Sequence, residues 1–339
     1  MGESIKEVVK ERYEDAGRCG SSKYCCAPQE KYSKEDLEGV PGDILALSSS
    51  CGNPVSLAQI GEGEVVVDIG CGAGLDLFLA ARRVGPTGRV IGIDSSPSML
   101  ARARVTFQEA GIRSAEFHEG TADSLPLADG TADVVLSNCV LCTMPDKERV
   151  LKEMFRVLKP SGRAVISDVV TPDGIPGGTP GAGGDAEAWA ACLVGVSPDA
   201  YLGLLMGAGF EDLQVLERSS STFRDGSVVE SMVVLARKPC GCAGGSAADP
   251  ASVAAPRVIL GARGTRRRPS GSVPRALFVR GPCPGPPSSR RARVRRPGAP
   301  PPRPPGDPPP RGAPTRRSRT GGGGGGTPAP CRGWRLPGR

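Results

Sequence analysis

The sequence predicts an α/β fold in which helices cover both faces of a doubly wound, mostly parallel sheet. Three observations support this fold. Short β-branched runs alternate with helical segments between Glu64 and Val170. The first run leads into Asp68–Gly74, a glycine-rich turn that is followed at once by a helix-forming segment. A second apolar run, Arg89–Asp94, also ends in an acid, so polar groups gather at the strand ends, where such sheets bind ligands.

Each element of this core has a local signal. Glu64–Val67 is apolar and β-branched, as buried parallel strands are, and Leu75–Arg83 is rich in helix formers. Ser96–Ala110 has Pro97 in its first turn and Gly111 as its stop. The expected core consists of strands over Val65–Gly70, Arg89–Asp94, Ala115–Gly120, Asp133–Cys139 and Arg163–Val170, with a third helix over Asp146–Leu158 that Lys159–Gly162 closes.

The segments on either side of the core are also structured by their pattern. Glu3–Asp15 has helical composition, and Ser33 is placed to cap a helix, with Asp36 three residues later. Beyond a Pro/Gly-rich connector we expect helices over Asp185–Gly195 and Pro198–Gly209 and strands over Phe210–Ser219 and Val228–Lys238. The predicted divisions are residues 1–63 (a helix and cysteine-bearing loops), 64–170 (the core), 171–242 (a C-terminal α+β region) and 243–339 (a tail).

The charge is divided between the tail and the rest of the chain. The chain has 339 residues and a net charge of +7, but residues 243–339 hold 20 Arg, no Lys and 2 Asp, a net charge of +18. The other residues hold 23 basic and 34 acidic side chains, a net charge of −11. Because the tail consists mainly of Pro, Gly, Arg and Ser, we expect it to be disordered. It could bind nucleic acid or an anionic membrane, but we favour GC-rich coding as its origin and expect no nucleic-acid partner for activity.

The sequence favours a cytoplasmic protein that acts as a monomer. No apolar run reaches the roughly 18–20 residues that a membrane span needs, so no membrane partner is expected. Met1–Gly20 is charged throughout and is not a secretory signal. The 12 cysteines are therefore expected to be ligands or redox groups rather than structural disulfides.

The spacing of the glycine turn decides which ligand it binds. A dinucleotide fingerprint needs G-x-G-x-x-G, whereas this turn reads D-x-G-x-G-x-G, with Leu75 where the third glycine would stand. The pattern resembles motif I of the class I S-adenosylmethionine-dependent methyltransferases, which have a Rossmann-like sheet. We expect Asp94 to take both ribose hydroxyls, since it ends the second strand. The full set of expected cofactor contacts is Asp68, Gly70, Gly72, Gly74, Asp94, Ser95, Met99, Ala122, Asp123 and Asn138.

The acid–base inventory limits the methyl acceptor. Nitrogen, oxygen and carbon acceptors usually need a base to remove a proton. The only histidine, His118, lies inside a predicted strand, and we interpret it as structural. An acceptor atom with its own lone pair fits better, and soft thiolates select thiophilic ions and metalloids. Cys51, Cys139 and Cys192 lie in three segments near the expected mouth of the sheet, where they would form a trigonal sulfur site.

Several motifs together resemble the arsenite S-adenosylmethionine methyltransferases over roughly residues 5–242. They are Ser50–Pro54, Asp68–Gly74, Ser137–Val140, Pro145–Lys147, Arg156–Pro160 and Trp189–Cys192. The resemblance implies that Cys51, Cys139 and Cys192 bind As(III), which attacks the methyl group, with S-adenosylmethionine as donor and glutathione or thioredoxin as thiol reductant. It also implies a redox partner for Cys51, which is Cys25 or Cys26, and we place Cys26 in the catalytic set. On this basis residues 64–170 bind the cofactor and residues 171–242 help to bind the metalloid.

The remaining cysteines differ in their expected roles. Cys142 stands where the family more often has Asn, so it is a spare ligand or a small core residue. We interpret Cys71 as a packing residue of the turn and Cys19 as an exposed bystander. Cys240 and Cys242 either pass As(III) to the site or have no catalytic role.

Two other functions compete with arsenite methylation and detoxification. One keeps the fold but methylates a small organic acceptor on carbon or oxygen, as quinone and sterol methyltransferases do. The other is a thiol-rich metalloid-binding protein without turnover. The scarcity of acid–base residues argues against the first, and the intact Asp68–Gly74 turn with Asp94 argues against the second.

Overall fold

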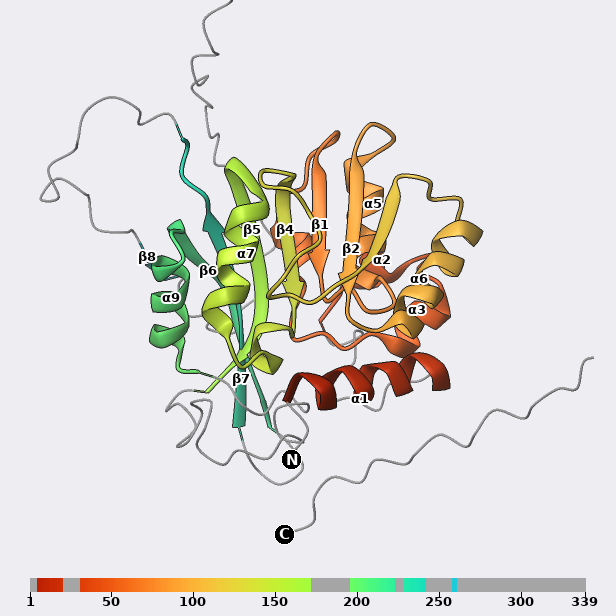
Figure 1. Ribbon diagram of the computed structural model, residues 1–339, viewed down its shortest axis with the longest axis horizontal. Coiled ribbons are helices and arrows are strands. Elements are labelled where there is room, and N and C mark those ends of the chain that lie inside the picture. The colour runs from red at the N-terminus through yellow and green to blue at the C-terminus, as the bar shows by residue number, and fades with distance from the viewer. Residues whose placement is uncertain (1–4, 21–30, 172–195, 223–227, 242–257, 261–339) are drawn as a thin grey trace, which may run out of the picture. The chain divides into compact units, whose positions relative to one another are not determined.

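A computed structural model describes residues 5–20, 31–171, 196–222, 228–241 and 258–260. Its centre is an eight-stranded sheet with the order β3-β2-β1-β4-β5-β7-β6-β8 (Figure 1). Neighbouring strands from β3 to β5 are parallel, and β7 runs antiparallel to both β5 and β6. The strands are β1 Val65–Ile69, β2 Arg89–Asp94, β3 Ala115–Glu119, β4 Ala132–Asn138, β5 Leu158–Val170, β6 Glu211–Thr222, β7 Val228–Arg237 and β8 Val258–Leu260.

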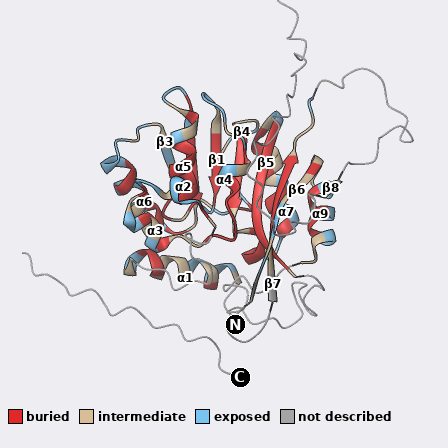
Figure 2. Cartoon of the chain, turned by 180° about the vertical axis from the view of Figure 1, so that it is seen from behind, coloured by how far each residue is buried: buried red, intermediate tan, exposed pale blue. Residues whose placement is uncertain are grey.

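Helices pack on both faces of the sheet, which confirms the predicted fold class. Val66 and Val67 are adjacent in β1 and fully buried, but they belong to different hydrophobic clusters. Because side chains alternate along a strand, the two clusters lie on opposite faces of the sheet, whose central strands are coloured as buried in Figure 2. The helices are α1 Ile5–Cys19, α2 Lys34–Leu37, α3 Gly42–Leu47, α4 Pro54–Leu57, α5 Leu75–Val84, α6 Pro97–Glu109, α7 Lys147–Val157 and α9 Pro198–Gly207, with a 3₁₀ turn, η2, over Leu141–Thr143.

Several helix starts follow the sequence signals. Ser33 accepts a hydrogen bond from the Asp36 backbone N–H at 3.0 Å and caps α2, as expected. Ser96 caps α6 and Asp146 caps α7 in the same manner. These side-chain oxygens satisfy backbone donors that have no partner within the helix.

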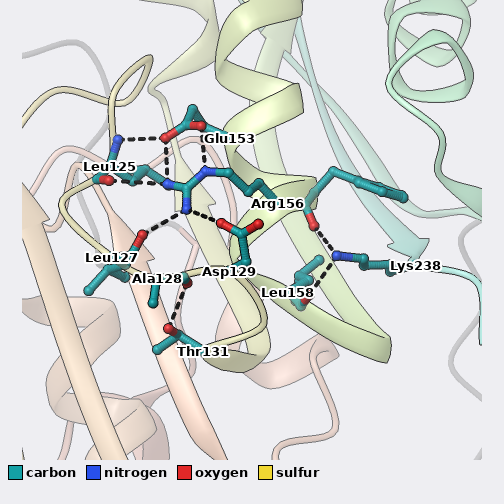
Figure 3. A network of polar contacts seen from close by, with 10 residues as sticks. Leu125, Leu127, Ala128, Asp129, Thr131, Glu153, Arg156, Leu158 and Lys238 are labelled. Carbon is teal, nitrogen blue, oxygen red and sulfur yellow. Dashed lines mark hydrogen bonds and ion pairs between the residues drawn. The ribbon is translucent and has the colours of Figure 1, made fainter. Parts of the chain in front are cut away.

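Figure 3 shows how α7 fastens the segment between β3 and β4. Arg156, part of one of the sequence motifs, donates to the carbonyl oxygens of Leu125 and Leu127 at 3.2 and 2.7 Å and pairs with Glu153 at 2.7 Å. Lys238 donates to the Phe155 carbonyl oxygen at 2.7 Å, and a cation at this end of a helix is favourable. The motif around Arg156 therefore has a structural role.

Two sequence predictions of element boundaries are wrong. Residues 159–162 were expected to form a turn, but β5 begins at Leu158, which pairs with Ala132 of β4. A register shift between Ala132 and Val134 and a positive φ of 65° at Ser161 allow the strand to bend there instead of ending. The tail was expected to be disordered throughout, but Val258–Leu260 forms β8, parallel to β6 at the edge of the sheet. The expected helix over residues 185–195 lies outside the described residues.

Candidate functional site

A cavity of about 220 Å³ lies at the carboxyl ends of β1, β2 and β4. It corresponds to the edge of a doubly wound sheet at which ligands bind. Eight of the ten predicted cofactor residues line it: Asp68, Gly70, Gly72, Asp94, Ser95, Met99, Ala122 and Asn138. Lys6, Lys10 and Tyr13 of α1 also line the cavity, so the N-terminal helix contributes to the site. No local pattern in the sequence predicts this contribution, because the contact depends on tertiary packing.

The three glycines of the turn have different roles. Gly70, Gly72 and Gly74 all have positive φ, of 69°, 53° and 95°, which glycine adopts without strain. A Cβ on Gly70 would lie 2.4 Å from a methyl of Val140, and one on Gly74 would lie 2.9 Å from the Phe107 ring. A Cβ on Gly72 would meet nothing within 4 Å, although Gly72 lines the cavity. Gly72 therefore offers the open backbone surface that a bound cofactor needs, whereas Gly74, which does not line the cavity, serves helix packing.

Asp94 is held by the backbone of both turns that surround the cavity. Its carboxylate accepts hydrogen bonds from the N–H groups of Gly72 and Ser96, each at 2.8 Å. Burial raises its pKa, while these backbone donors act in the opposite direction. Ser95 N–H also donates to this carboxylate, whose two oxygens have about four acceptor positions, so the group can still accept a hydrogen bond from a diol.

Asp68 and Asp76 add buried acidic groups beside Asp94. Burial, followed by the charges of Asp76 and Asp94, raises the pKa of Asp68 well above its ordinary value. Burial raises the pKa of Asp76 to about 6, against hydrogen bonds from Tyr32 and Asn138. When these three carboxyl groups are ionised, their negative charges repel one another, and a nearby positive charge offsets that repulsion. The three groups together therefore favour a cationic ligand. The residues therefore fit a sulfonium cofactor.

Asp123 follows the cavity residue Ala122 and makes polar contacts with two helices. Its carboxylate pairs with Lys6 of α1, and Arg149 donates to its carbonyl oxygen at 2.9 Å. Burial raises the pKa of Asp123, but hydrogen bonds from Lys6 and Thr121 outweigh burial and lower the pKa overall. Asp123 does not line the cavity, and these contacts tie α1 to the segment after β3, so its contact with a cofactor stays a prediction.

Asn138 holds the loop that carries Cys51. Its Oδ1 accepts a hydrogen bond from the Cys51 backbone N–H at 3.0 Å. Its Nδ2 lies 3.0 Å from the Gly52 carbonyl oxygen, 3.0 Å from Asp76 Oδ2 and 3.1 Å from the Tyr32 hydroxyl, and its two hydrogens are shared among these three acceptors. Tyr32 in turn donates to Asp76 at 2.7 Å. Asn138 was predicted as a cofactor residue, and Tyr32 and Asp76 were missed, because a network between such distant segments has no local sequence signal.

Two of the three predicted arsenic ligands lie together. Cys51 and Cys139, 88 residues apart in sequence, form a disulfide with a Cα–Cα distance of 5.9 Å. Both are buried, and Cys139 also lines the cavity. Its backbone has a positive φ of 57°, a conformation that is strained for a residue other than glycine. Cys192, Cys25 and Cys26 lie outside the described residues, and within the described chain no group of three His, Cys, Asp or Glu side chains is placed to hold a metal ion.

Two other cysteines, Cys71 and Cys19, and the histidine lie in three different environments. Cys71 is buried in the glycine turn, where a Cβ on Gly92 would lie 2.8 Å from its sulfur, and this confirms its packing role. Cys19 is disulfide-bonded, so its interpretation as a bystander is wrong. His118 lies within β3, 3.5 Å from Glu116, and does not line the cavity, which agrees with a structural role.

Comparisons with known proteins agree on a methyltransferase. A family model described as "Methyltransferase domain" matches residues 60–202. An arsenite methyltransferase of Halobacterium salinarum is 35% identical over 266 residues, 70% of this chain and 67% of that protein. A demethylmenaquinone methyltransferase of Lactococcus lactis is 34% identical over 170 residues, 50% of this chain and 64% of that protein.

A solved structure is similar as well. The crystal structure of an arsenic(III) S-adenosylmethionine methyltransferase from Chlamydomonas reinhardtii is 29% identical, with a TM-score of 0.53, over 62% of this chain and 74% of that chain. Among the described residues no helix is long and apolar enough to cross a membrane.

Proposed function

Because the chain belongs to the arsenite methyltransferase family and has the class I S-adenosylmethionine-dependent methyltransferase fold, we propose that it methylates trivalent arsenic bound to cysteine thiolates. The observation that carries this proposal is the meeting of Cys51 and Cys139 beside the glycine-turn cavity. Two sulfur atoms from distant segments, in contact at the edge of a cofactor cavity, suit a thiophilic substrate.

The cavity residues account for cofactor binding. S-adenosylmethionine, when bound, supplies an electrophilic methyl group on a sulfonium. Gly72 leaves room for the ligand against the backbone, and Asp94 presents its carboxylate to a diol. Asp68 and Asp76 favour a positive charge nearby, since burial and mutual repulsion raise the pKa of Asp68.

The thiols hold the substrate. A thiol reductant, glutathione or thioredoxin, must first reduce the Cys51–Cys139 disulfide, because only thiolates bind arsenic. As(III) bound by three thiolates, with Cys192 as the expected third, keeps a lone pair that can accept the methyl group. No proton has to leave arsenic, so the reaction needs no general base, and no histidine lines the cavity.

A quinone-type activity is the alternative, because demethylmenaquinone methyltransferases are among the relatives. Methylation of a carbon acceptor requires a base to remove a proton. Asp68 and Asp76, whose buried carboxyl groups line the described cavity, are candidates for that base.

The test is a pair of reactions with the reduced protein and methyl-labelled S-adenosylmethionine. One contains As(III) and glutathione, and the other contains a demethylmenaquinone analogue. We expect label in methylated arsenic, separated by chromatography, and none in the quinone. Cys139→Ser should lose the arsenic product, whereas Ser137→Ala, which changes the same strand, should retain it. Label in the quinone alone would replace our proposal with the alternative.

A further inference from the structure

We propose that Cys142 exchanges with the Cys51–Cys139 disulfide, forming a Cys139–Cys142 disulfide and releasing the Cys51 thiol. The exchange itself requires no arsenic, and only its consequence for turnover rests on the proposed function. The role goes beyond that function, which uses Cys51, Cys139 and Cys192 as ligands and leaves Cys142 unassigned.

The three sulfur atoms belong to one isolated cluster. Cys51, Cys139, Cys142 and Val169 form a buried group of their own, separate from the main hydrophobic clusters. Cys142 is 1% exposed, Cys51 2% and Cys139 6%. Bulk thiols therefore reach this cluster poorly, and the neighbour most available to react with the disulfide is Cys142.

The local sequence favours the new bond. Cys139-Val140-Leu141-Cys142 has C-x-x-C spacing, which is typical of reversible redox disulfides. The 3₁₀ turn η2 follows Cys139, with hydrogen bonds from Thr143 N–H to the Val140 carbonyl oxygen and from Met144 N–H to the Leu141 carbonyl oxygen. Cys139 lies two residues before this turn and Cys142 lies within it, and both side chains belong to the same buried cluster.

Asp168 holds Cys142 in place for this exchange. Its carboxylate accepts hydrogen bonds from the Cys142 backbone N–H at 3.0 Å and from the Cys142 thiol. Among the described residues the buried Tyr201 hydroxyl has no hydrogen-bond partner, and the charges of Asp168 and Cys142 raise its pKa together with burial. Asp168 is 0% exposed, so water does not compete with the Cys142 thiol for a hydrogen bond to this carboxylate.

The exchange balances within the protein. The Cys142 sulfur attacks Cys139, the bond between Cys51 and Cys139 breaks, and the proton of Cys142 ends on Cys51. No oxidant or reductant is consumed, because one disulfide and one thiol are present before and after. The hydrogen bonds between Asn138 and the Cys51 and Gly52 backbone then still hold the segment around Cys51 to β4. In arsenite turnover, this release would open the oxidised site to an external thiol reductant.

Peptide mapping of the full-length oxidised protein tests the exchange without arsenic. The protein is trapped with N-ethylmaleimide in acid and digested with trypsin. Cys139 and Cys142 share one tryptic peptide, Ser114–Lys147, whereas Cys51 lies in another, Glu35–Arg82. A Cys139–Cys142 bond therefore gives a single peptide lighter by two hydrogens with Cys51 alkylated, and a Cys51–Cys139 bond gives a cross-linked pair with Cys142 alkylated.

We expect the wild type to yield both species and Cys51→Ser to yield only the internal bond. Cys142→Ala should yield only the cross-linked pair, and Cys240→Ser, outside the cluster, should match the wild type. If Cys142 is always recovered in its alkylated form from the wild-type protein, the proposal is overturned. This result does not depend on whether any variant folds. Failure of the proposed function would instead appear as absent arsenic methylation with the exchange intact.

Discussion

Asn138→Ala tests whether the Cys51 loop depends on Asn138. The substitution removes the acceptor of the Cys51 N–H and the donor to the Gly52 carbonyl oxygen, Asp76 and Tyr32. A hydrogen bond contributes roughly 0.5–1.5 kcal/mol, and a buried polar group left without a partner costs roughly 1–3 kcal/mol. Since Tyr32 and Asp76 still pair with each other, we expect a loss of about 2–4 kcal/mol in the free energy of unfolding.

Urea unfolding under reducing conditions measures this loss, because no disulfide then restrains the loop. Ser137→Ala, at the preceding residue of β4, is the matched control. Its buried hydroxyl has no hydrogen-bond partner in the described part of the chain, so its removal should change the free energy of unfolding by less than about 0.5 kcal/mol or raise it. The rate of Cys51 alkylation should rise in Asn138→Ala and not in the control. Equal stability losses in the two variants, or an unchanged alkylation rate, would refute the role of Asn138.

Three further results follow from the site. Asp94→Ala should weaken S-adenosylmethionine binding by about tenfold to a hundredfold in calorimetry, since a carboxylate contact to a diol contributes roughly 1.5–3 kcal/mol; unchanged affinity in the folded variant would remove this assignment. In product analysis, Cys51→Ser should abolish methylation of inorganic As(III) but spare some methylation of methylarsenite, because methylarsenite has one valence occupied by carbon and holds only two thiolates. Cys139→Ser should lose both activities. Burial raises the pKa of Asp168 from 3.8 to about 6, so between these values the folded protein keeps a proton that the unfolded chain releases. The free energy of unfolding should therefore fall as the pH rises from about 4 to about 6. The fall should be smaller in Asp168→Asn, and parallel pH profiles of urea unfolding would contradict this.

The parts of the structure that the sequence predicted are those with local signals. β-branched runs such as Glu64–Val67 predicted the strands, and Ser33 and Pro97 predicted helix starts. The topology then places the ends of β1, β2 and β4 at one edge, which is why most of the predicted cofactor residues line one cavity.

The residues that sequence reasoning assigned differently depend on distant contacts. Asp123 pairs with Lys6, 117 residues away, and Gly74 is required by Phe107 on another helix. No periodicity or spacing in the sequence predicts either contact. The C-x-x-C spacing of Cys139 and Cys142 was visible, but its meaning depends on Cys51 and Asp168, which only the fold brings alongside.

X-ray absorption at the arsenic edge tests the central claim most directly, because it reports the atoms bound to arsenic in the reduced protein. We expect As(III) in the wild type to be surrounded by three sulfur atoms and no oxygen, at a stoichiometry of one per chain. Cys139→Ser should lose one sulfur neighbour or fail to bind, while Ser137→Ala should match the wild type. An oxygen-coordinated arsenic in the wild type, or a sulfur shell unchanged in Cys139→Ser, would contradict arsenic binding at this site.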